Sequence, residues 1–381
     1  MSAVNTHNLD HAFMARALEV ARLGWYSTAP NPRVGCVLVA NGRIVAEGWH
    51  AKAGEAHAEV LALRQVPEVK DLTAYVTLEP CSHFGKTPPC ADALINAGVK
   101  RVVVAQQDPN PLVSGRGLER LRQAGIAVQV GIMQAEAEAL NSGFNKRMRT
   151  GLPLVRTKLA MSLDGRTALA SGESKWITSP AARQDVQRLR AQSSAILTGV
   201  DTVLADDPSL NLRDMAQNPF LAPFAQADAG ILSPVRVILD SRLRTPVSAK
   251  MLGLPGRSMI LTVSSDAVKI AALRQAGFEV HTLPGSKQQL DLLAVLQFLG
   301  QQQFNEVLLE AGPTLNGAFL AANLLDEGIV YMAPSLLGDR ARGLFCLPEI
   351  LTMADKKLVV WQDVRRVGPD LRITFSFNEA S

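Results

Sequence analysis

One imidazole, two thiols and a nearby carboxylate occur within a short stretch of this chain. His57 and Glu59 are separated by one residue, Cys81 follows a proline, and Cys90 closes the run CSHFGKTPPC. A catalytic zinc ion takes three nitrogen or sulfur ligands and keeps its fourth position open for water. Bound zinc lowers the pKa of that water, and a free carboxylate can then carry protons to a leaving group. The pattern therefore requires a fold that brings three separate segments together around a metal.

Local sequence explains how these side chains can converge. Residues two apart do not share a helical face, so His57 and Glu59 can meet only at the start of a helix. Gly54 precedes them, and AEVLALRQV follows with helical spacing of its apolar residues. Pro88-Pro89 likewise suits a helix start and places Cys90 in its first turn. The positive end of a helix favours the thiolate form of cysteine.

Two other interpretations of the cluster are open. A closed structural zinc site would need a fourth ligand, for which His83 is the nearby candidate. A core histidine with unrelated buried cysteines would make the acidic neighbour and the Pro-Cys pair coincidental. The order H-x-E, P-C and a second cysteine is instead typical of zinc nucleobase deaminases. Here, however, eight residues separate the cysteines instead of two.

The longer form has a resemblance of its own. PCSHFGKTPPC, APNPRVGCVLV and GWHAKAGEAHAE resemble the deaminase half of the bifunctional riboflavin-biosynthesis deaminase/reductases. Strand and helix patterns alternate through this half, including a hairpin at Asn41-Gly42, and predict an α/β/α sandwich. The resemblance implies its cytidine-deaminase-like version, with Asn31, His50 and Lys86 as substrate positions. For His50, a capped loop histidine is the competing interpretation.

The second half resembles the reductase domain of the same family, which has a dihydrofolate-reductase-like α/β fold. The motifs TKLAMSLDGRTA, SGESKWIT, TGVDTVLADDPSLNLR, ILDS and EAGPTLNGAFL occur in the family's order. The resemblance implies NADPH-dependent reduction of a ribosyl group. It places the cofactor at Ala160, Trp176, Thr202, Asp206, Ser241, Gly312, Pro313, Thr314, Leu315, Asn316, Gly317 and Ala318, and the substrate at Ser174, Arg190, Leu210, Arg213 and Glu310.

Physical chemistry supports some of these positions better than others. A strand-to-helix turn at EAGPT can hold an anion on its backbone N–H groups, although many structural turns look alike. Arg190 and Arg213 suit a substrate phosphate, whereas solvated surface arginines are the default alternative. Lys158 is a candidate for polarising the opened sugar or, equally, for a structural ion pair. Gly115-Arg116-Gly117 is a partial dinucleotide fingerprint that we interpret as a helix cap.

The chain as a whole has the size of two domains. It has 381 residues, and the Gly-Pro break in TGLPLV predicts a deaminase domain over residues 1–149 and a reductase domain over 150–381. AEAEALNSGFNKRMR before the break reads as one helix, SAILTGVDTVLADDPSLNLR as a strand and a polar turn, and residues 214–230 as a variable surface insertion.

Composition limits the partners. A net charge of +4 without blocks of like charge argues against a nucleic-acid surface and suits anionic small substrates. Four cysteines without a disulfide pattern, a polar N-terminus and no long apolar run predict a cytoplasmic protein that does not enter a membrane. We expect a homo-oligomer, with a dimer favoured.

These observations predict a bifunctional enzyme that uses Zn²⁺ and NADPH. It would deaminate 2,5-diamino-6-ribosylamino-4(3H)-pyrimidinone 5′-phosphate, with Glu59 as proton shuttle, and then reduce the sugar of 5-amino-6-(5-phosphoribosylamino)uracil. One rival is a nucleic-acid base deaminase with a C-terminal targeting domain. The other is a zinc-stabilised scaffold without activity, in which a free acid beside the metal has no use.

Overall fold

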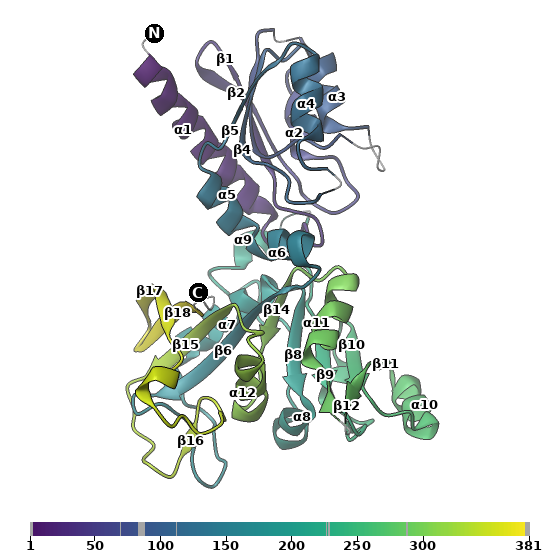
Figure 1. Ribbon diagram of the computed structural model, residues 1–381, viewed down its shortest axis with the longest axis vertical. Helices are drawn as coiled ribbons and strands as arrows, with labels where there is room; N and C mark the ends of the chain where they lie inside the picture. The colour runs from purple at the N-terminus through teal and green to yellow at the C-terminus, as the bar shows by residue number, and fades with distance from the viewer. Residues whose placement is uncertain are drawn as a thin grey trace. The chain divides into compact units, whose positions relative to one another are not determined.

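The computed structural model describes residues 3–68, 70–82, 88–111, 113–225, 227, 229–286 and 289–377. The chain forms two compact units (Figure 1). Unit 1 comprises Met1–Gly151 and Ala227–Leu232, and unit 2 comprises Leu152–Gln226 and Ser233–Ser381. Lys86, an expected substrate position, and His83, the alternative metal ligand, lie outside the described residues. Within the described part of the chain, every helix is too short or too polar to cross a membrane.

Unit 1 is the α/β/α sandwich that the alternating pattern predicts. Its five strands lie in the order β2-β1-β3-β4-β5, with β1 antiparallel to both neighbours and β3, β4 and β5 parallel. The strands are β1 (Gly35–Ala40), β2 (Arg43–Trp49), β3 (Thr73–Leu78), β4 (Arg101–Gln106) and β5 (Ala127–Val130). The helices are α1 (Ala3–Ala21), α2 (Ala58–Leu63), α3 (Cys90–Asn96), α4 (Arg116–Gln123), α5 (Gln134–Leu140) and α6 (Ser142–Thr150), with a 3-10 turn at Arg22–Gly24.

Strand alternation gives this sheet two apolar faces. Leu38 and Val104 pack with α2, α3 and α4 on one face. Val37 and Val103, one residue away, pack with α1 and α5 on the other face. Successive strand side chains point to opposite faces, so both sides of the sheet are buried. The predicted hairpin at Asn41-Gly42 is confirmed, with both residues at positive φ.

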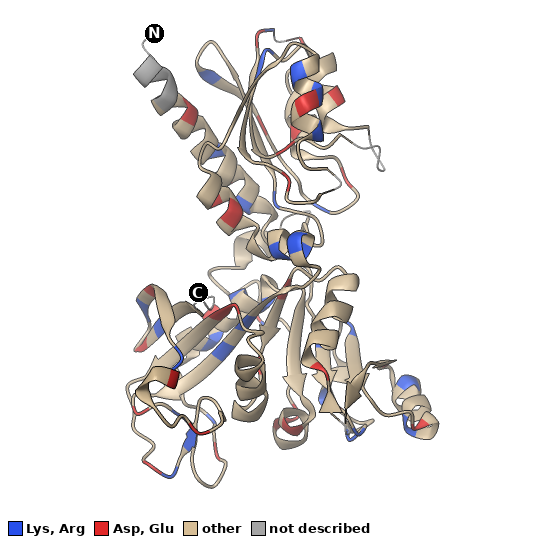
Figure 2. Ribbon diagram, in the orientation of Figure 1, with Lys and Arg blue, Asp and Glu red and all other residues tan. Residues whose placement is uncertain are grey.

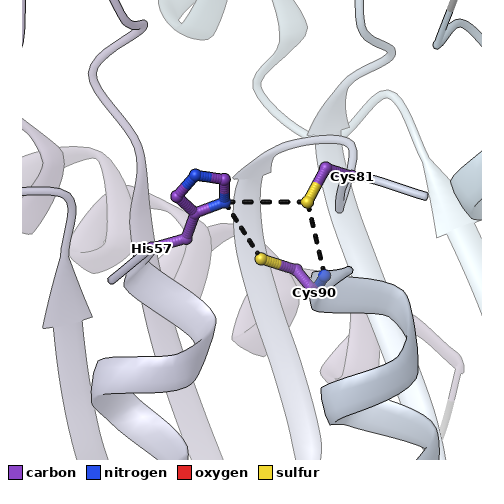
Figure 3. Close-up of side chains that lie close together, drawn as sticks. All are labelled: His57, Cys81 and Cys90. Carbon is purple, nitrogen blue, oxygen red and sulfur yellow. Dashed lines mark hydrogen bonds between the residues drawn. The ribbon is translucent and has the colours of Figure 1, made fainter. Parts of the chain in front are cut away.

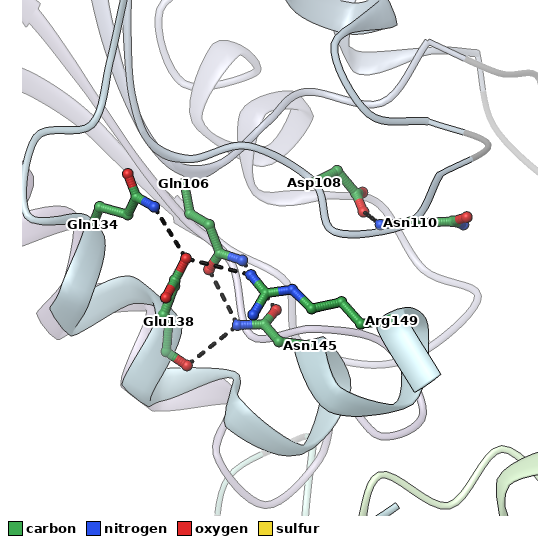
Figure 4. A network of polar contacts seen from close by, with 7 residues as sticks. All are labelled: Gln106, Asp108, Asn110, Gln134, Glu138, Asn145 and Arg149. Carbon is green, nitrogen blue, oxygen red and sulfur yellow. Dashed lines mark hydrogen bonds and ion pairs between the residues drawn. The ribbon is translucent and has the colours of Figure 1, made fainter. Parts of the chain in front are cut away.

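The prediction of one helix through AEAEALNSGFNKRMR was wrong, because the helix is broken at Asn141. Asn141 accepts a hydrogen bond from the backbone N–H of Arg33 at 2.8 Å and donates one to the Arg33 carbonyl at 2.9 Å. Its backbone has φ −119, outside the helical range. One turn later, the buried Asn145 pairs with Gln106 at the end of β4 (Figure 4). The helix is thus interrupted at Asn141 alone, whereas Asn145 bonds to β4 from within α6.

Unit 2 is built on a nine-stranded sheet in the order β11-β10-β9-β8-β14-β6-β15-β18-β17. Neighbouring strands are parallel from β11 to β15, and β18 and β17 form an antiparallel edge. The sheet strands are β6 (Leu154–Ser162), β8 (Ala195–Gly199), β9 (Val235–Leu239), β10 (Ser258–Thr262), β11 (Glu279–Thr282), β14 (Glu306–Leu309), β15 (Glu327–Ala333), β17 (Val359–Val367) and β18 (Asp370–Phe377). Short pairs are β7 (Arg166–Ala168) with β16 (Arg342–Gly343) and β12 (Gly285–Ser286) with β13 (Gln289–Leu290).

Helices cover both faces of this sheet. Leu197 and Leu309 pack with α11 and α12, whereas Ile196, Ile238 and Ile260 face the opposite side. The helices are α7 (Pro180–Ala191), α8 (Val200–Asp206), α9 (Ala222–Ala225), α10 (Ala267–Ala276), α11 (Leu292–Gln301) and α12 (Pro313–Ala321), with 3-10 turns at Lys250–Gly253 and Met353–Asp355.

Two predictions for unit 2 need correction. In SAILTGVDTVLADDPSLNLR the expected strand and polar turn are separated by the helix α8, which was not predicted and whose Val200 and Val203 are buried. The segment 214–230 is not simply a surface insertion, because Leu221 is fully buried and Asn218 is 2% exposed. The Asn218 side chain donates to the Gln184 carbonyl at 2.9 Å, which ties the segment to α7.

Candidate functional site

The predicted metal ligands come together in unit 1 (Figure 3). His57 precedes the first residue of α2 in extended conformation, Cys81 follows β3, and Cys90 is the first residue of α3. His57 Nδ1 lies 3.1 Å from Cys90 Sγ and 3.6 Å from Cys81 Sγ. Zn–S bonds of ~2.3 Å and Zn–N bonds of ~2.0 Å imply ligand separations of roughly 3.5 Å in a tetrahedral site. Donor types and spacing therefore fit zinc.

The two thiols also have the electrostatics of a metal site. The Cys90 thiol donates a hydrogen bond that, with His57, lowers the pKa of Cys81 to about 4. The same bond raises the pKa of Cys90, so the pair shares one proton. As zinc ligands, both Cys81 and Cys90 would have to be thiolates, so this shared proton would be lost. Cys36 is fully buried in β1 and does not belong to the ligand group.

Glu59 is a buried carboxylate beside this cluster. It lies in the first turn of α2 and is 3% exposed, and its Oε2 has no hydrogen-bond partner among the described residues. Burial raises its pKa to about 7. A carboxyl group with a pKa near neutral pH can both accept and release a proton under working conditions.

Asn31 and His50, two expected substrate positions, also lie together. The Asn31 amide Nδ2 is 3.0 Å from His50 Nε2, and His50 Nδ1 is 3.2 Å from the Ala56 carbonyl. Burial lowers the pKa of His50, so the ring is neutral, with Nδ1–H donating to Ala56 and Nε2 accepting from Asn31. The ring meets that of His57 edge-on, at 5.2 Å between centroids. His50 is thus a loop histidine whose ring is fixed by two hydrogen bonds beside His57, one of the expected metal ligands.

Unit 2 contains a cavity of about 1160 Å³. It opens where β8, β9 and β14 end, which is where parallel α/β sheets bind ligands. Seven basic and three acidic side chains line it, so it suits anionic ligands. Elsewhere in both units, basic and acidic positions are interspersed (Figure 2). The expected positions that line the cavity are Lys158, Ala160, Ser174, Trp176, Arg190, Thr202, Asp206, Leu210, Ser241, Glu310, Gly312, Pro313, Thr314, Leu315 and Ala318.

Three expected positions in this unit do not line the cavity. The Asn316 side chain is fully buried, accepting from Thr157 Oγ1 at 2.6 Å and donating to the Ala311 carbonyl at 2.7 Å. A Cβ on Gly317 would lie 1.9 Å from the Cys346 carbonyl, so this glycine allows close packing of the backbone. Arg213 is exposed outside the cavity lining. Sequence motifs alone could not separate these structural roles from ligand contacts.

An ion-pair group forms the floor of the cavity. Glu310 accepts hydrogen bonds from Arg190 Nε at 2.6 Å and Nη2 at 3.0 Å, and Lys158 Nζ lies 3.7 Å from its Oε2. Burial raises the pKa of Glu310, but the charges of Arg190 and Lys158 outweigh this and lower it to about 2. Lys158 therefore makes the ion pair that was one of its two predicted roles, while still facing the cavity.

Sequence reasoning missed five of the seven basic residues that line this cavity, among them Arg183 and Arg242. Arg183 stacks on Trp176 with 4.6 Å between the guanidinium carbon and the ring centroid. Arg242 directly follows the expected cofactor residue Ser241, and its guanidinium forms no ion pair with the described residues. Its position after the ILDS motif was the available signal.

Comparison with known proteins matches both units. Residues 153–371 match the RibD C-terminal domain, and residues 7–106 match the cytidine and deoxycytidylate deaminase zinc-binding region. The riboflavin biosynthesis protein RibD of Escherichia coli is 53% identical, covering 95% of this chain and 98% of its own length. That of Haemophilus influenzae is 49% identical, covering 96% and 97%.

Two solved structures resemble the chain over almost its full length. RibD of Acinetobacter baumannii has a TM-score of 0.88 and 46% identity, covering 98% of this chain and 100% of its own. A diaminohydroxyphosphoribosylaminopyrimidine deaminase/5-amino-6-(5-phosphoribosylamino)uracil reductase of Thermotoga maritima has a TM-score of 0.84 and 30% identity, with the same coverage.

Proposed function

The chain belongs to the RibD family of riboflavin biosynthesis proteins, which makes it both a deaminase and a reductase, and from this premise we propose how its residues divide the chemistry. Unit 1 deaminates and unit 2 reduces. The alternative of a nucleic-acid base deaminase with a targeting domain is not favoured, because the C-terminal part matches the RibD C-terminal domain.

In unit 1, His57, Cys81 and Cys90 would hold a zinc ion. When bound, zinc supplies a Lewis acid that makes water acidic enough to lose a proton near neutral pH. Glu59 takes that proton, and the oxygen of the water adds to the ring carbon that bears the exocyclic amine. Glu59 then returns the proton to the amine, the C–N bond breaks, and ammonia leaves. Asn31 and the neutral His50 hold the substrate, 2,5-diamino-6-ribosylamino-4(3H)-pyrimidinone 5′-phosphate, beside the metal group. The observation that carries this assignment is the buried Glu59 Oε2, which has no hydrogen-bond partner in the described part of the chain and lies beside three ligand atoms within 4.8 Å of one another.

In unit 2, NADPH would reduce the ribosyl group of 5-amino-6-(5-phosphoribosylamino)uracil to a ribityl chain. The cavity exceeds the range of roughly 300–1,000 Å³ that is usual for one ligand, so it has room for cofactor and substrate together. Arg242, next to Ser241, is the charged group available for the extra phosphate that distinguishes NADPH from NADH. Lys158 faces the opened sugar, and its ion pair with Glu310 holds the lysine side chain in place.

The experiment that tests this division changes Glu59 to glutamine. Each variant receives the diaminopyrimidine and, separately, the deaminated intermediate with NADPH, and ammonia release and NADPH consumption are measured independently. Glu59→Gln should keep its zinc and lose roughly 10²–10⁴-fold in deamination, because it lacks the proton carrier. Reduction should continue at the wild-type rate. Glu55→Gln, an exposed change four residues earlier, is the control and should retain both activities.

Two outcomes would contradict the assignment. Deamination by Glu59→Gln at the wild-type rate would remove the residue from the mechanism. Loss of both reactions in a folded protein would show that the two units do not act independently.

We also propose a homodimer that forms through β17, in the cytoplasm. This strand is the last in the sheet order, and Trp361, Val360 and Val364 are 63%, 44% and 58% exposed. Antiparallel pairing of two copies centred on Val364 would place Asp363 opposite the second copy's Arg365, a favourable cross-strand charge pair. All four cysteines are free, and two of them are needed as metal ligands, which fits a reducing compartment.

A further inference from the structure

Glu79 is a buried carboxylate that neither proposed reaction uses. It directly follows β3, lies two residues before Cys81 and is 4% exposed. Its Oε2 accepts the backbone N–H groups of Gly115 at 2.9 Å and Asp108 at 3.2 Å. Its Oε1 accepts those of Gly117 at 2.9 Å and Leu118 at 3.4 Å. Four backbone donors from two segments thus converge on one side chain.

Three of these donors belong to the start of α4. Gly115 precedes the first residue of the helix at φ +80 and offers no side-chain cap, so the first N–H groups need an acceptor from elsewhere. The Glu79 carboxylate supplies it, and its negative charge is favourable at the positive end of the helix. The Gly115-Arg116-Gly117 sequence therefore receives an internal carboxylate and not a dinucleotide phosphate.

The contact extends from Glu79 to the chain that leads into Cys81. A Cβ on Gly117 would lie 2.0 Å from the Pro80 carbonyl, so α4 packs directly on this backbone. Proline fixes its own φ, which leaves few free torsions between Glu79 and Cys81. On its other side, Cys81 is tied to α3, because its carbonyl accepts from Ala91 N–H at 3.1 Å and its Sγ from Cys90 N–H at 3.3 Å.

We propose that Glu79 is a positioning residue for the metal site, holding the Cys81 sulfur where it can ligate zinc. This rests on the proposed function of unit 1. The helix α4 acts as a rigid support, and Glu79 binds the end of β3 to it. Because Cys81 is only two residues from Glu79, the position of its sulfur is fixed as well. Removing the carboxylate leaves the start of α4 without an acceptor and lets the Pro80-Cys81 segment move.

Glu79→Gln is the main test because it keeps the volume but turns one acceptor oxygen into an NH₂ group facing backbone N–H donors. Zinc affinity of the folded apoprotein is measured by competition with a chromogenic chelator, and ligand geometry by the visible spectrum of the Co²⁺-substituted protein. We expect affinity to fall 10–100-fold, as is usual when groups that orient metal ligands are lost, with altered Co²⁺ bands. Glu119→Gln is the control, since this exposed residue lies on the same helix and contacts Gln123.

A residue with a merely structural role would lower the stability of unit 1 without changing zinc affinity or the Co²⁺ spectrum of the folded protein. Wild-type affinity and spectrum in folded Glu79→Gln would therefore overturn the proposal. If that variant does not fold, Glu79→Asp takes its place, because the shorter carboxylate keeps the charge but cannot reach both pairs of donors. A wild-type protein that binds no zinc would instead overturn the metal site itself.

Discussion

Replacing Glu310 with glutamine measures how much the buried ion pair in unit 2 stabilises the fold. Glu310 and Arg190 form two hydrogen bonds, and both side chains are 9% exposed. The substitution leaves the Arg190 guanidinium buried without a counter-charge, which is strongly destabilising. Arg257–Glu279 is a matched control in the same unit. It is also doubly bonded, at 2.8 Å and 2.8 Å, but its side chains are 53% and 37% exposed.

The pKa of Glu310 sets the magnitude. It is about 2 in the folded protein against 4.5 for an ordinary glutamate. That difference corresponds to about 3 kcal/mol of unfolding free energy at neutral pH. Because the folded-state pKa is depressed, this stability is present above the unfolded pKa and is lost as pH falls towards 2. Roughly 2 kcal/mol of it has gone by pH 3. An exposed pair contributes about 0–1 kcal/mol, so Glu279→Gln should have little effect.

Urea unfolding provides the assay if unit 2 can be followed alone. Trp25 and Trp49 lie in unit 1, so their replacement by phenylalanine leaves Trp176 and Trp361 to report on unit 2. In this background, Glu310→Gln should unfold at clearly lower urea than the parent at pH 7, and the gap should narrow at pH 3. Equal midpoints for Glu310→Gln and Glu279→Gln, or a gap independent of pH, would refute the reasoning.

Two further predictions follow from exposed residues of unit 2. Arg242→Ala should lower kcat/KM for NADPH roughly 10–100-fold, because it removes a charged contact to the phosphate, and should leave the weaker use of NADH unchanged. An equal loss of kcat/KM with both cofactors would exclude phosphate recognition by Arg242. Arg257→Ala, outside the cavity, is the control. Trp361→Glu should convert the dimer to a monomer, as measured by light scattering at micromolar concentration. Val268→Glu, at a position 80% exposed on α10, is the control and should remain a dimer. If both variants are dimers, the interface does not lie at β17.

The metal group could be predicted from the sequence because local rules place each ligand. A helix start brings His57 and Glu59 together, and the proline pair before Cys90 places that cysteine at the start of another helix. The alternation of apolar residues likewise predicted the sandwich of unit 1. Such signals are short-range, so they survive without knowledge of the tertiary contacts.

What could not be predicted depends on partners distant in sequence. Asn141 breaks its helix for the backbone of Arg33, 108 residues away. The Asn316 side chain, expected to contact the cofactor, instead bonds to Thr157, 159 residues away. The residues around each asparagine are compatible with both the expected and the observed arrangement. The hydrogen-bond partner that decides between them lies more than 100 residues away and is not visible in the local pattern. At Asn141 a buried polar contact overrules the helical pattern, whereas at Asn316 the helix forms as predicted and only the side chain's partner differs from the one expected.

The buried carboxylates are a second case in which groups distant in sequence matter, because those groups help to set the pKa of each carboxylate. Glu59 and Glu310 are both withdrawn from water, which by itself raises the pKa of each. Glu310 meets Arg190 and Lys158, so its pKa falls to about 2 and it stays a fixed charge at any working pH. For Glu59 burial outweighs the opposing effect of His57 and raises its pKa to about 7, and its Oε2 has no hydrogen-bond partner among the described residues. Burial beside Arg190 and Lys158 thus keeps Glu310 charged, whereas the protein alone leaves Glu59 with a pKa near neutral, which is what its proposed role of proton carrier requires.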